Sequence, residues 1–253
     1  MKTNKIILMY HDVFNKTPDE SGFCSPGANF YKLSSTLFED HVNKISKLIN
    51  DKRIKRENIV FTFDDGGVSA ATIIAPILEK YGFWGYFFVA TDMINKSGFV
   101  NESQIRTLIE HGHLVGSHSA THPENMLDLS ANDNRKEWMD SVKRLEQVLE
   151  RRIDLVSIPN GYFRNSDIKT LKELGIRKIY TSKIGQYEIN DGIELLGRYA
   201  ITSAHSSVYL EKLITNSFTR FLKLYKQKSL EVIKTLLGKK YMLIKKVIRA
   251  VQK

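Results

Sequence analysis

The chain has 253 residues, of which 42% are hydrophobic, enough for one large domain or for one domain with an appendage. Its single cysteine, Cys24, excludes an internal disulfide, so the fold is not expected to depend on an oxidising compartment. The net charge of +10 is uneven: residues 211–253 carry 12 Lys+Arg and 2 Asp+Glu, and the rest of the chain is balanced.

Strand and helix patterns alternate along residues 5–196. Seven short apolar segments are typical of strands, at 5–10, 58–63, 84–90, 113–117, 153–158, 176–181 and 193–196. Apolar residues at helical spacing predict the helices between them, at about 35–49, 69–81, 102–111, 130–150 and 165–175. Strict alternation implies parallel strands joined by helices, so we predict an α/β fold, a deformed parallel (β/α) barrel of about seven strands.

After residue 206 the pattern changes to a basic helical tail. Apolar residues recur there at helical spacing in three groups: Phe218, Phe221, Leu222 and Tyr225; Ile233, Leu236 and Leu237; and Ile244, Val247, Ile248 and Val251. Lysines fill the other faces, so the tail is predicted to be either a helix packed on the barrel or an anchor on an anionic membrane surface. Nucleic acid is not expected as a partner, because no base-reading motif accompanies the charge.

The lengths of the apolar segments indicate where in the cell the protein is expected. No segment reaches the length of about 18 apolar residues that a transmembrane helix needs, and the run at 6–10 is too short for the core of a secretory signal. We therefore expect a cytoplasmic protein, peripheral at the inner membrane face if the tail is an anchor.

Two polar motifs follow predicted strands. The first contains Asp64 and Asp65, whose side chains would point to opposite faces of an extended segment. They can serve one site only if the strand has ended, and Gly66-Gly67 supplies a turn.

The second motif contains His118 and His122, four residues apart. Pro123 disfavours a helical conformation for His122, so both imidazoles are predicted on a loop after a strand. Parallel strands present their carboxyl ends at one edge, where α/β folds place their chemistry. Two carboxylates and two imidazoles there can hold one divalent metal and leave one carboxylate to act as a base.

The residues around these motifs carry a family resemblance. Thr-Phe-Asp-Asp-Gly at 62–66 and His-Ser-x-x-His-Pro at 118–123 resemble the first two motifs of the polysaccharide deacetylases, the NodB-homology family of carbohydrate esterases. The resemblance extends over about residues 5–201. It implies a metal, most simply Zn²⁺, held at the mouth of the barrel by Asp65, His118 and His122, with Asp64 as the general base.

Two further segments fit this family. Residues 157–162 resemble its third motif, a loop that lines the sugar site, and so make Asn160 a candidate oxyanion donor through its backbone N–H. Residues 8–13 resemble the first strand of the branch that includes poly-N-acetylglucosamine deacetylases, which implies that His11 lies in the active site. Tyr10 and Tyr162 adjoin these motifs and are candidates for stacking on a sugar ring.

The sequence also departs from the family pattern. The arginine expected two residues before the proline of the third motif is Ser157 here, and Arg198 is a candidate replacement or a substrate-binding residue. The fourth motif, Asp-x-x-Asp-Trp, has no match, and residues 201–205 match the last motif, Leu-x-His, only loosely. The general acid is therefore open between His11, the first choice, and His205.

Together these observations predict a deacetylase domain at 1–206 and a basic tail at 207–253. The predicted function is metal-dependent removal of acetyl groups from N-acetylated sugars of a polysaccharide or glycan precursor. Two alternatives stay open, a weakened glycan-binding module of the same fold and another barrel metallohydrolase.

Overall fold

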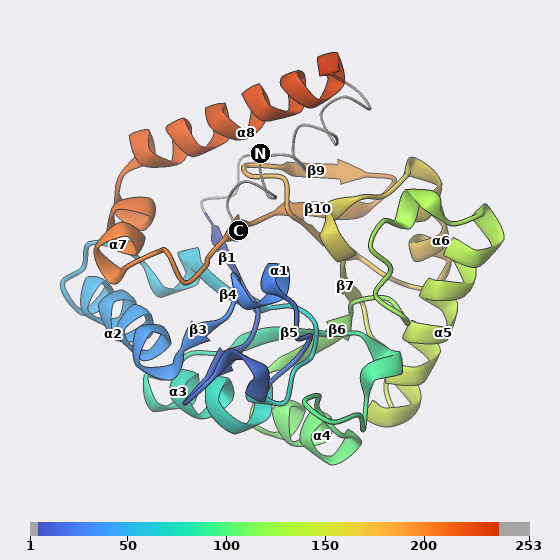
Figure 1. Cartoon of the computed structure of the whole chain (residues 1–253), viewed down its shortest axis with the longest axis horizontal. Helices are drawn as coiled ribbons and strands as arrows, with labels where there is room; N and C mark the ends of the chain where they lie inside the picture. Colours follow the sequence, from blue (N-terminus) through green and yellow to red (C-terminus); the bar gives the residue numbers. More distant parts are fainter. Residues whose placement is uncertain (1–4, 238–253) are drawn as a thin grey trace.

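The computed structural model describes residues 5–237. A mostly parallel sheet of nine strands lies at its centre, in the order β11-β1-β4-β5-β6-β7-β8-β10-β9. It curls into a deformed barrel with helices around the outside (Figure 1). The seven predicted segments all form strands of this sheet, β1 (Ile6–Tyr10), β4 (Ile59–Phe63), β5 (Gly85–Val89), β6 (Leu114–Ser117), β7 (Leu155–Ser157), β8 (Lys178–Thr181) and β10 (Ile193–Gly197). The predicted fold class is confirmed.

One extended segment joins the two sides of the curled sheet. Its first part, β10, pairs with β8, and its second part, β11 (Tyr199–Ala200), pairs with β1. Only Arg198 separates the two parts, so this residue lies where the chain passes from one side of the barrel to the other.

Four short strands were not predicted, and β11 is one of them. An antiparallel strand, β9 (Tyr187–Asn190), extends the sheet beyond β10. The strands β2 (Val13–Phe14) and β3 (Leu33–Ser34) form a separate pair near the carboxyl end of β1. The segment between them includes the short helix α1 (Pro26–Asn29).

The five predicted helical regions cover the outer face of the sheet (Figure 1), as α2 (Ser35–Asn50), a π turn at Ala70–Ile74 followed by α3 (Ala75–Lys80), α4 (Glu102–Glu110), α5 (Ala131–Leu149) and α6 (Asn165–Glu173). Serine hydroxyls begin two of them, because Ser34 accepts from the N–H of Leu37 and Ser130 accepts from the N–H of Asp133.

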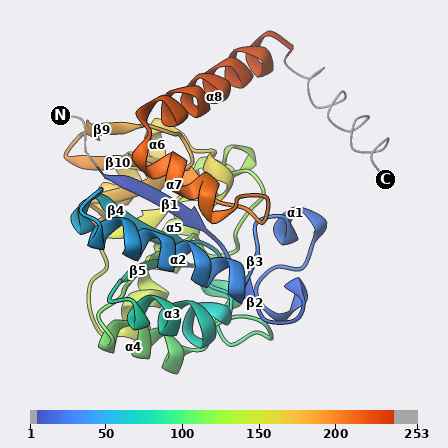
Figure 2. The same ribbon diagram turned by 90° about the vertical axis from the view of Figure 1, so that its left-hand side faces the viewer.

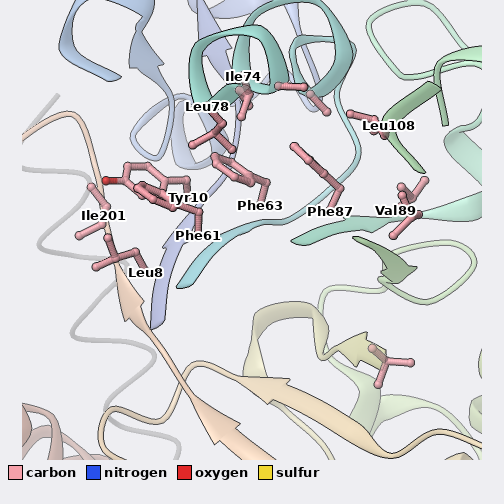
Figure 3. Packing of buried hydrophobic residues seen from close by; sticks show 14 of the residues in the cluster. Leu8, Tyr10, Phe61, Phe63, Ile74, Leu78, Phe87, Val89, Leu108 and Ile201 are labelled. Carbon is pink, nitrogen blue, oxygen red and sulfur yellow. The ribbon is translucent and has the colours of Figure 1, made fainter. Parts of the chain in front are cut away.

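Successive strand residues contribute to two apolar layers. The larger layer lies between the sheet and the helices, and Figure 3 shows Leu8, Phe61, Phe63 and Phe87 within it. The smaller layer lies on the opposite face of the strands, inside the barrel, and is formed by Ile7, Val60, Phe88, Leu155, Tyr180 and Leu196. The sheet is therefore buried on both faces, as expected for parallel strands.

The tail begins with a helix that belongs to the barrel. Helix α7 (Ser207–Thr215) packs against α2 and buries Leu210, Leu213 and Ile214 in the larger layer. A boundary at residue 206 would separate these side chains from the core, so we propose that the boundary lies at about residue 216.

Helix α8 (Ser217–Leu237) follows. It begins beside α7 on the outside of the barrel, and its far end extends away from the barrel (Figure 2). The last predicted apolar group, Ile244 to Val251, lies outside the described residues. Within residues 5–237, no helix combines the length and the apolar character that crossing a bilayer requires.

Candidate metal centre and active site

Two neighbouring aspartates follow strand β4 at the mouth of the barrel. The N–H of Asp64 still donates to the carbonyl of Tyr10, at 3.1 Å. Asp65 and Gly66 then adopt positive φ angles of 78° and 82°, and a Cβ at Gly66 would lie 2.9 Å from Cγ1 of Val89. The strand has ended here, as predicted, and both carboxylates are buried.

The two imidazoles lie on the loop that follows β6, also as predicted. The Nε2 atoms of His118 and His122 lie 3.5 and 3.3 Å from the same atom, Oδ1 of Asp65. One ligand atom from each of these three residues lies within 4.8 Å of the other two. The structure therefore brings the three predicted metal ligands together.

A hydrogen bond outside this cluster fixes the proton on His118. Its Nδ1 lies 3.0 Å from the carbonyl oxygen of Ser157, and because a carbonyl only accepts, Nδ1 carries the proton. A neutral His118 then presents the lone pair of Nε2 to Asp65. Such a lone pair repels a carboxylate oxygen unless a proton or a cation lies between them, so two nitrogens and one oxygen form a donor set that fits a divalent metal.

Burial and charge act in opposite directions on these groups. Burial raises the pKa of Asp65, but the adjoining His118 and His122 hold that pKa well below its usual range. Burial lowers the pKa of His122, and the contact with Asp65 raises it by more, so the net change is upward. Asp65 therefore stays ionised, as a metal ligand must be.

The loop of the imidazoles is held in a strained backbone conformation. Ser119 and His122 have φ angles of 65° and 57°, which cost on the order of 1–3 kcal/mol each outside glycine. The carboxylate of Glu137 on α5 accepts from the N–H groups of Ala120 and Thr121, at 3.1 and 3.0 Å. These bonds fix the loop. Nothing in the sequence distinguishes Glu137 from a solvent-facing carboxylate, so it was not predicted.

Arg198 forms a buried ion pair with Asp64, the neighbour of Asp65. Its Nη1 and Nη2 donate to Oδ1 and Oδ2 of Asp64, each at 2.7 Å, in a bidentate ion pair that is almost fully buried. The hydroxyl of Ser157 accepts from Arg198 at 2.8 Å and donates to Asp64 at 3.2 Å. Burial raises the pKa of Asp64, but Arg198 and His118 lower it by more.

These contacts exclude a direct role for Arg198 in binding substrate. Its five N–H groups make five hydrogen bonds within the protein, to both oxygens of Asp64, to Thr62 Oγ1, to Ser157 Oγ and to the carbonyl of Thr181. No N–H group is left for a sugar, so that prediction is corrected. The geometry matches the other hypothesis, in which Arg198 replaces the arginine that is missing at Ser157.

Tyr10 is also displaced from its predicted role. Its ring is completely buried in the outer layer, where it packs against Phe38 and, as Figure 3 shows, lies beside Phe61 and Phe63. Its hydroxyl lies 3.3 Å from Nδ1 of His41. A ring enclosed in this way cannot stack on a sugar. Residue 10 points to the core because it shares a strand face with Leu8.

The two candidate acids have different surroundings. His11 rests on the ring of Tyr31, at 4.7 Å between centroids, and its buried Nδ1 has no partner among the described residues. Burial lowers the pKa of His11, while the carboxylates of Asp65 and Asp64 raise it in part, with a net decrease. His11 therefore lies within electrostatic reach of both aspartates.

His205 faces another part of the molecule. Its ring stacks on Tyr209 at 4.3 Å, and its Nδ1 accepts from the N–H of Thr202 at 3.0 Å. Burial, with Lys223 and His41 nearby, lowers the pKa of His205 to about 4. None of these neighbours belongs to the aspartate and histidine cluster.

The predicted sugar-site loop follows β7 directly. Ser157 ends this strand beside Asp64 and His118, and the loop reaches Asn160 and Tyr162 a few residues later. Asn160 has a positive φ of 53°, and the Tyr162 ring is 46% exposed. Both residues are thus open to solvent and close in sequence to the buried site.

The sequence matches the model of a known protein family. The model of the family described as polysaccharide deacetylase matches residues 51–179, about half of the chain, and this range includes Asp64, Asp65, His118 and His122. The chain belongs to the polysaccharide deacetylase family. Its members are hydrolases that deacetylate polysaccharides, so the family resemblance predicted from the motifs is confirmed.

Individual relatives share the fold or much of the sequence length, but their sequence identity to this chain is low. A protein of Bacillus subtilis (strain 168), YxkH, is 24% identical over 214 residues, which cover 79% of this chain and 72% of that protein. The deacetylase PplD of Streptococcus pyogenes has the same fold, with a TM-score of 0.67 at 19% identity over 83% of this chain and 97% of PplD. A de-N-acetylase from Aggregatibacter actinomycetemcomitans gives a TM-score of 0.65 at 18% identity, with coverage of 82% and 98%.

Proposed function

We propose that this polysaccharide deacetylase is a metal-dependent N-deacetylase of N-acetylated sugars, in a polysaccharide or in a glycan precursor. The observation that carries the proposal is the pairing of two aspartates with different partners. Asp65 faces His118 and His122, whereas both oxygens of its neighbour Asp64 are bound by Arg198. This difference supports Asp65 as a metal ligand and Asp64 as the base.

Asp65, His118 and His122 would hold the metal, and two nitrogens with one oxygen suit Zn²⁺. When bound, the metal would lower the pKa of a water molecule and polarise the acetyl carbonyl. The protein's own part is to present these ligands already oriented, with His118 fixed by its hydrogen bond to Ser157.

Asp64 would take the proton from the attacking water. Arg198 supports this role in two ways, because it fixes both carboxylate oxygens and keeps the pKa of Asp64 below its usual range. The amide C–N bond then breaks, and the products are acetate and a free amino sugar.

The leaving amine needs a proton, and His11 is the proposed donor. The charged groups that act most on the pKa of His11 are the two aspartates, whereas those that act on the pKa of His205 are Lys223 and His41. The backbone N–H of Asn160 is the proposed donor to the oxyanion, and the exposed ring of Tyr162 is proposed to pack against the sugar.

Replacing His11 by alanine is expected to lower kcat by roughly 10²–10⁴-fold while metal content stays near one ion per chain, because His11 is not a ligand. His205→Ala is the matched control and should retain most of the activity. Acetate release and metal analysis of the same samples measure both effects. A normal rate for His11→Ala, with a collapsed rate for His205→Ala, would reverse the assignment.

The function itself is tested by acetate release from N-acetylglucosamine oligomers. The purified chain loaded with Zn²⁺ is expected to release acetate and to leave free amines. A chelator should abolish this activity, and added Zn²⁺ should restore it.

Two results would point to the alternatives. Binding of the oligomers without acetate release from the metal-loaded chain would indicate a glycan-binding module. Two metal ions per chain, with hydrolysis of a phosphoester or another amide instead, would indicate a different barrel metallohydrolase.

A further inference from the structure

Helix α8 contacts the barrel through polar side chains. Arg220 donates to the carbonyls of Leu213 and Ile214, at 2.9 and 2.7 Å. Farther along the same face, Gln227 donates to the carbonyl of Ser182 at 3.0 Å and accepts from the N–H of Ile184 at 2.7 Å. Hydrogen bonds to backbone groups therefore hold much of this helix in place.

Leu224 is half-buried and lies toward Gly185, but another apolar face in the first half of α8 points away from the barrel. Four side chains lie on it at helical spacing and are largely exposed: Phe218 (62%), Phe221 (59%), Leu222 (49%) and Tyr225 (65%). A surface helix normally buries its apolar face. Here Arg220 and Gln227 are turned inward and these four apolar side chains outward, so the outward face has no partner among the described residues.

Charge surrounds this outward face. Lys226 and Lys228 are exposed beside it, and residues 217–237 contain five Lys+Arg against one acidic residue. The following residues, 238–253, add six Lys+Arg and no Asp or Glu. A second copy of the same face would bring like charges together, whereas an anionic surface would be complementary to it.

We propose that the outward face of α8, formed by Phe218, Phe221, Leu222 and Tyr225, lies on an anionic lipid surface. Aromatic and leucine side chains on one face with lysines beside them are the composition of helices that lie in the membrane interface. Each lysine near such a surface contributes attraction that salt weakens. The inference goes beyond the proposed function and does not depend on it.

Co-sedimentation with vesicles tests this proposal on the full chain. The chain is expected to bind vesicles of phosphatidylcholine with phosphatidylglycerol at low salt, to leave them at high salt, and to ignore vesicles of phosphatidylcholine alone. Phe221→Ser with Tyr225→Ser should weaken partitioning by on the order of tenfold or more. Lys226→Glu with Lys228→Glu should weaken it by roughly 30-fold or more, because two attractive charges are lost and two repulsive charges are added.

Two control pairs of substitutions on other parts of the surface test whether vesicle binding depends on this face or on exposed apolar and basic side chains in general. Trp84 and Met139 are 57% and 43% exposed and lie just before β5 and on α5, so Trp84→Ser with Met139→Ser removes exposed apolar area away from α8. Lys143 and Lys169 are exposed on other helices, so Lys143→Glu with Lys169→Glu makes the same charge change. Both control pairs should bind like the unmodified chain.

Three results would overturn the proposal. The chain could stay in solution with acidic vesicles, or the α8 pairs could behave like the control pairs. Light scattering could instead reveal a dimer that dissociates in the Phe221→Ser with Tyr225→Ser variant, which would mean that this face binds a second copy of the chain. Acetate release from soluble oligomers should be the same in all four pairs, so a failure here is distinct from a failure of the proposed function.

Discussion

Asp64→Asn should leave the metal in place and lower the rate of acetate release by roughly 10²–10⁴-fold, because only the base is removed. Asp65→Asn should lose metal and activity together, because it removes the carboxylate that faces both imidazoles at 3.5 and 3.3 Å. His118→Ala and His122→Ala should behave like Asp65→Asn. Metal analysis and acetate release on the same preparations measure both properties.

The variant Asp64→Asn also affects stability, because Asp64 forms a buried ion pair with Arg198. Asp64→Asn leaves the guanidinium of Arg198 without its counter-charge in a site that is only about 1% exposed, which destabilises the fold. The double variant Asp64→Asn with Arg198→Met removes both charges. It should fold, bind metal and remain inactive.

The outcome that would contradict these roles is specific. Loss of metal in the folded double variant, with metal retained in Asp65→Asn, would mean that Asp64 is the ligand and Asp65 the base.

Much of the fold could be predicted because its signals are local. Each parallel strand is a short apolar run, and glycines such as Gly112 and Gly175 stop the helices with positive φ angles. Because parallel strands align their carboxyl ends, motifs that follow β4 and β6 had to meet at one edge. The ligands Asp65, His118 and His122 are brought together for this reason.

What the sequence left open or got wrong depends on contacts between distant segments. The sequence offered Arg198 either as the replacement arginine or as a substrate-binding residue. It lies 134 residues from Asp64, at the point where β10 passes into β11, and only the closure of the barrel brings it to Asp64 and favours the first alternative. Tyr10 was misassigned because both faces of β1 are apolar, so its sequence does not show which face meets the helices. The outward turn of α8 likewise follows from hydrogen bonds to Ser182 and Ile184, which no helical pattern reveals.

One local signal was available and was not used. Asp191-Gly192 separates β9 from β10, and both residues have positive φ, at 50° and 82°. A two-residue Asp-Gly link between strands is a strong hairpin signal. It predicts the antiparallel strand that extends the sheet.

Arg198→Met should cost both stability and catalysis. Removing one partner of a buried ion pair leaves Asp64 uncompensated, which costs about 3–5 kcal/mol in the free energy of unfolding. Arg135→Met is the matched control, because its ion pair with Glu173 is exposed and contributes at most about 1 kcal/mol. Denaturant unfolding of the two variants measures the difference.

The pH dependence separates a positioning role from a merely structural one. Burial raises the pKa of Asp64 and Arg198 lowers it, so without Arg198 that pKa should rise. Because the base works in its ionised form, the acid limb of the kcat/KM profile should move to higher pH. Arg198→Lys keeps the positive charge but cannot bind both carboxylate oxygens of Asp64. Compared with Arg198→Met, it should bring the acid limb back toward its original pH but restore less of kcat. An unshifted acid limb in a folded, metal-loaded Arg198→Met enzyme would show that Arg198 supports the fold alone, and that the base is oriented by Ser157 or by another group.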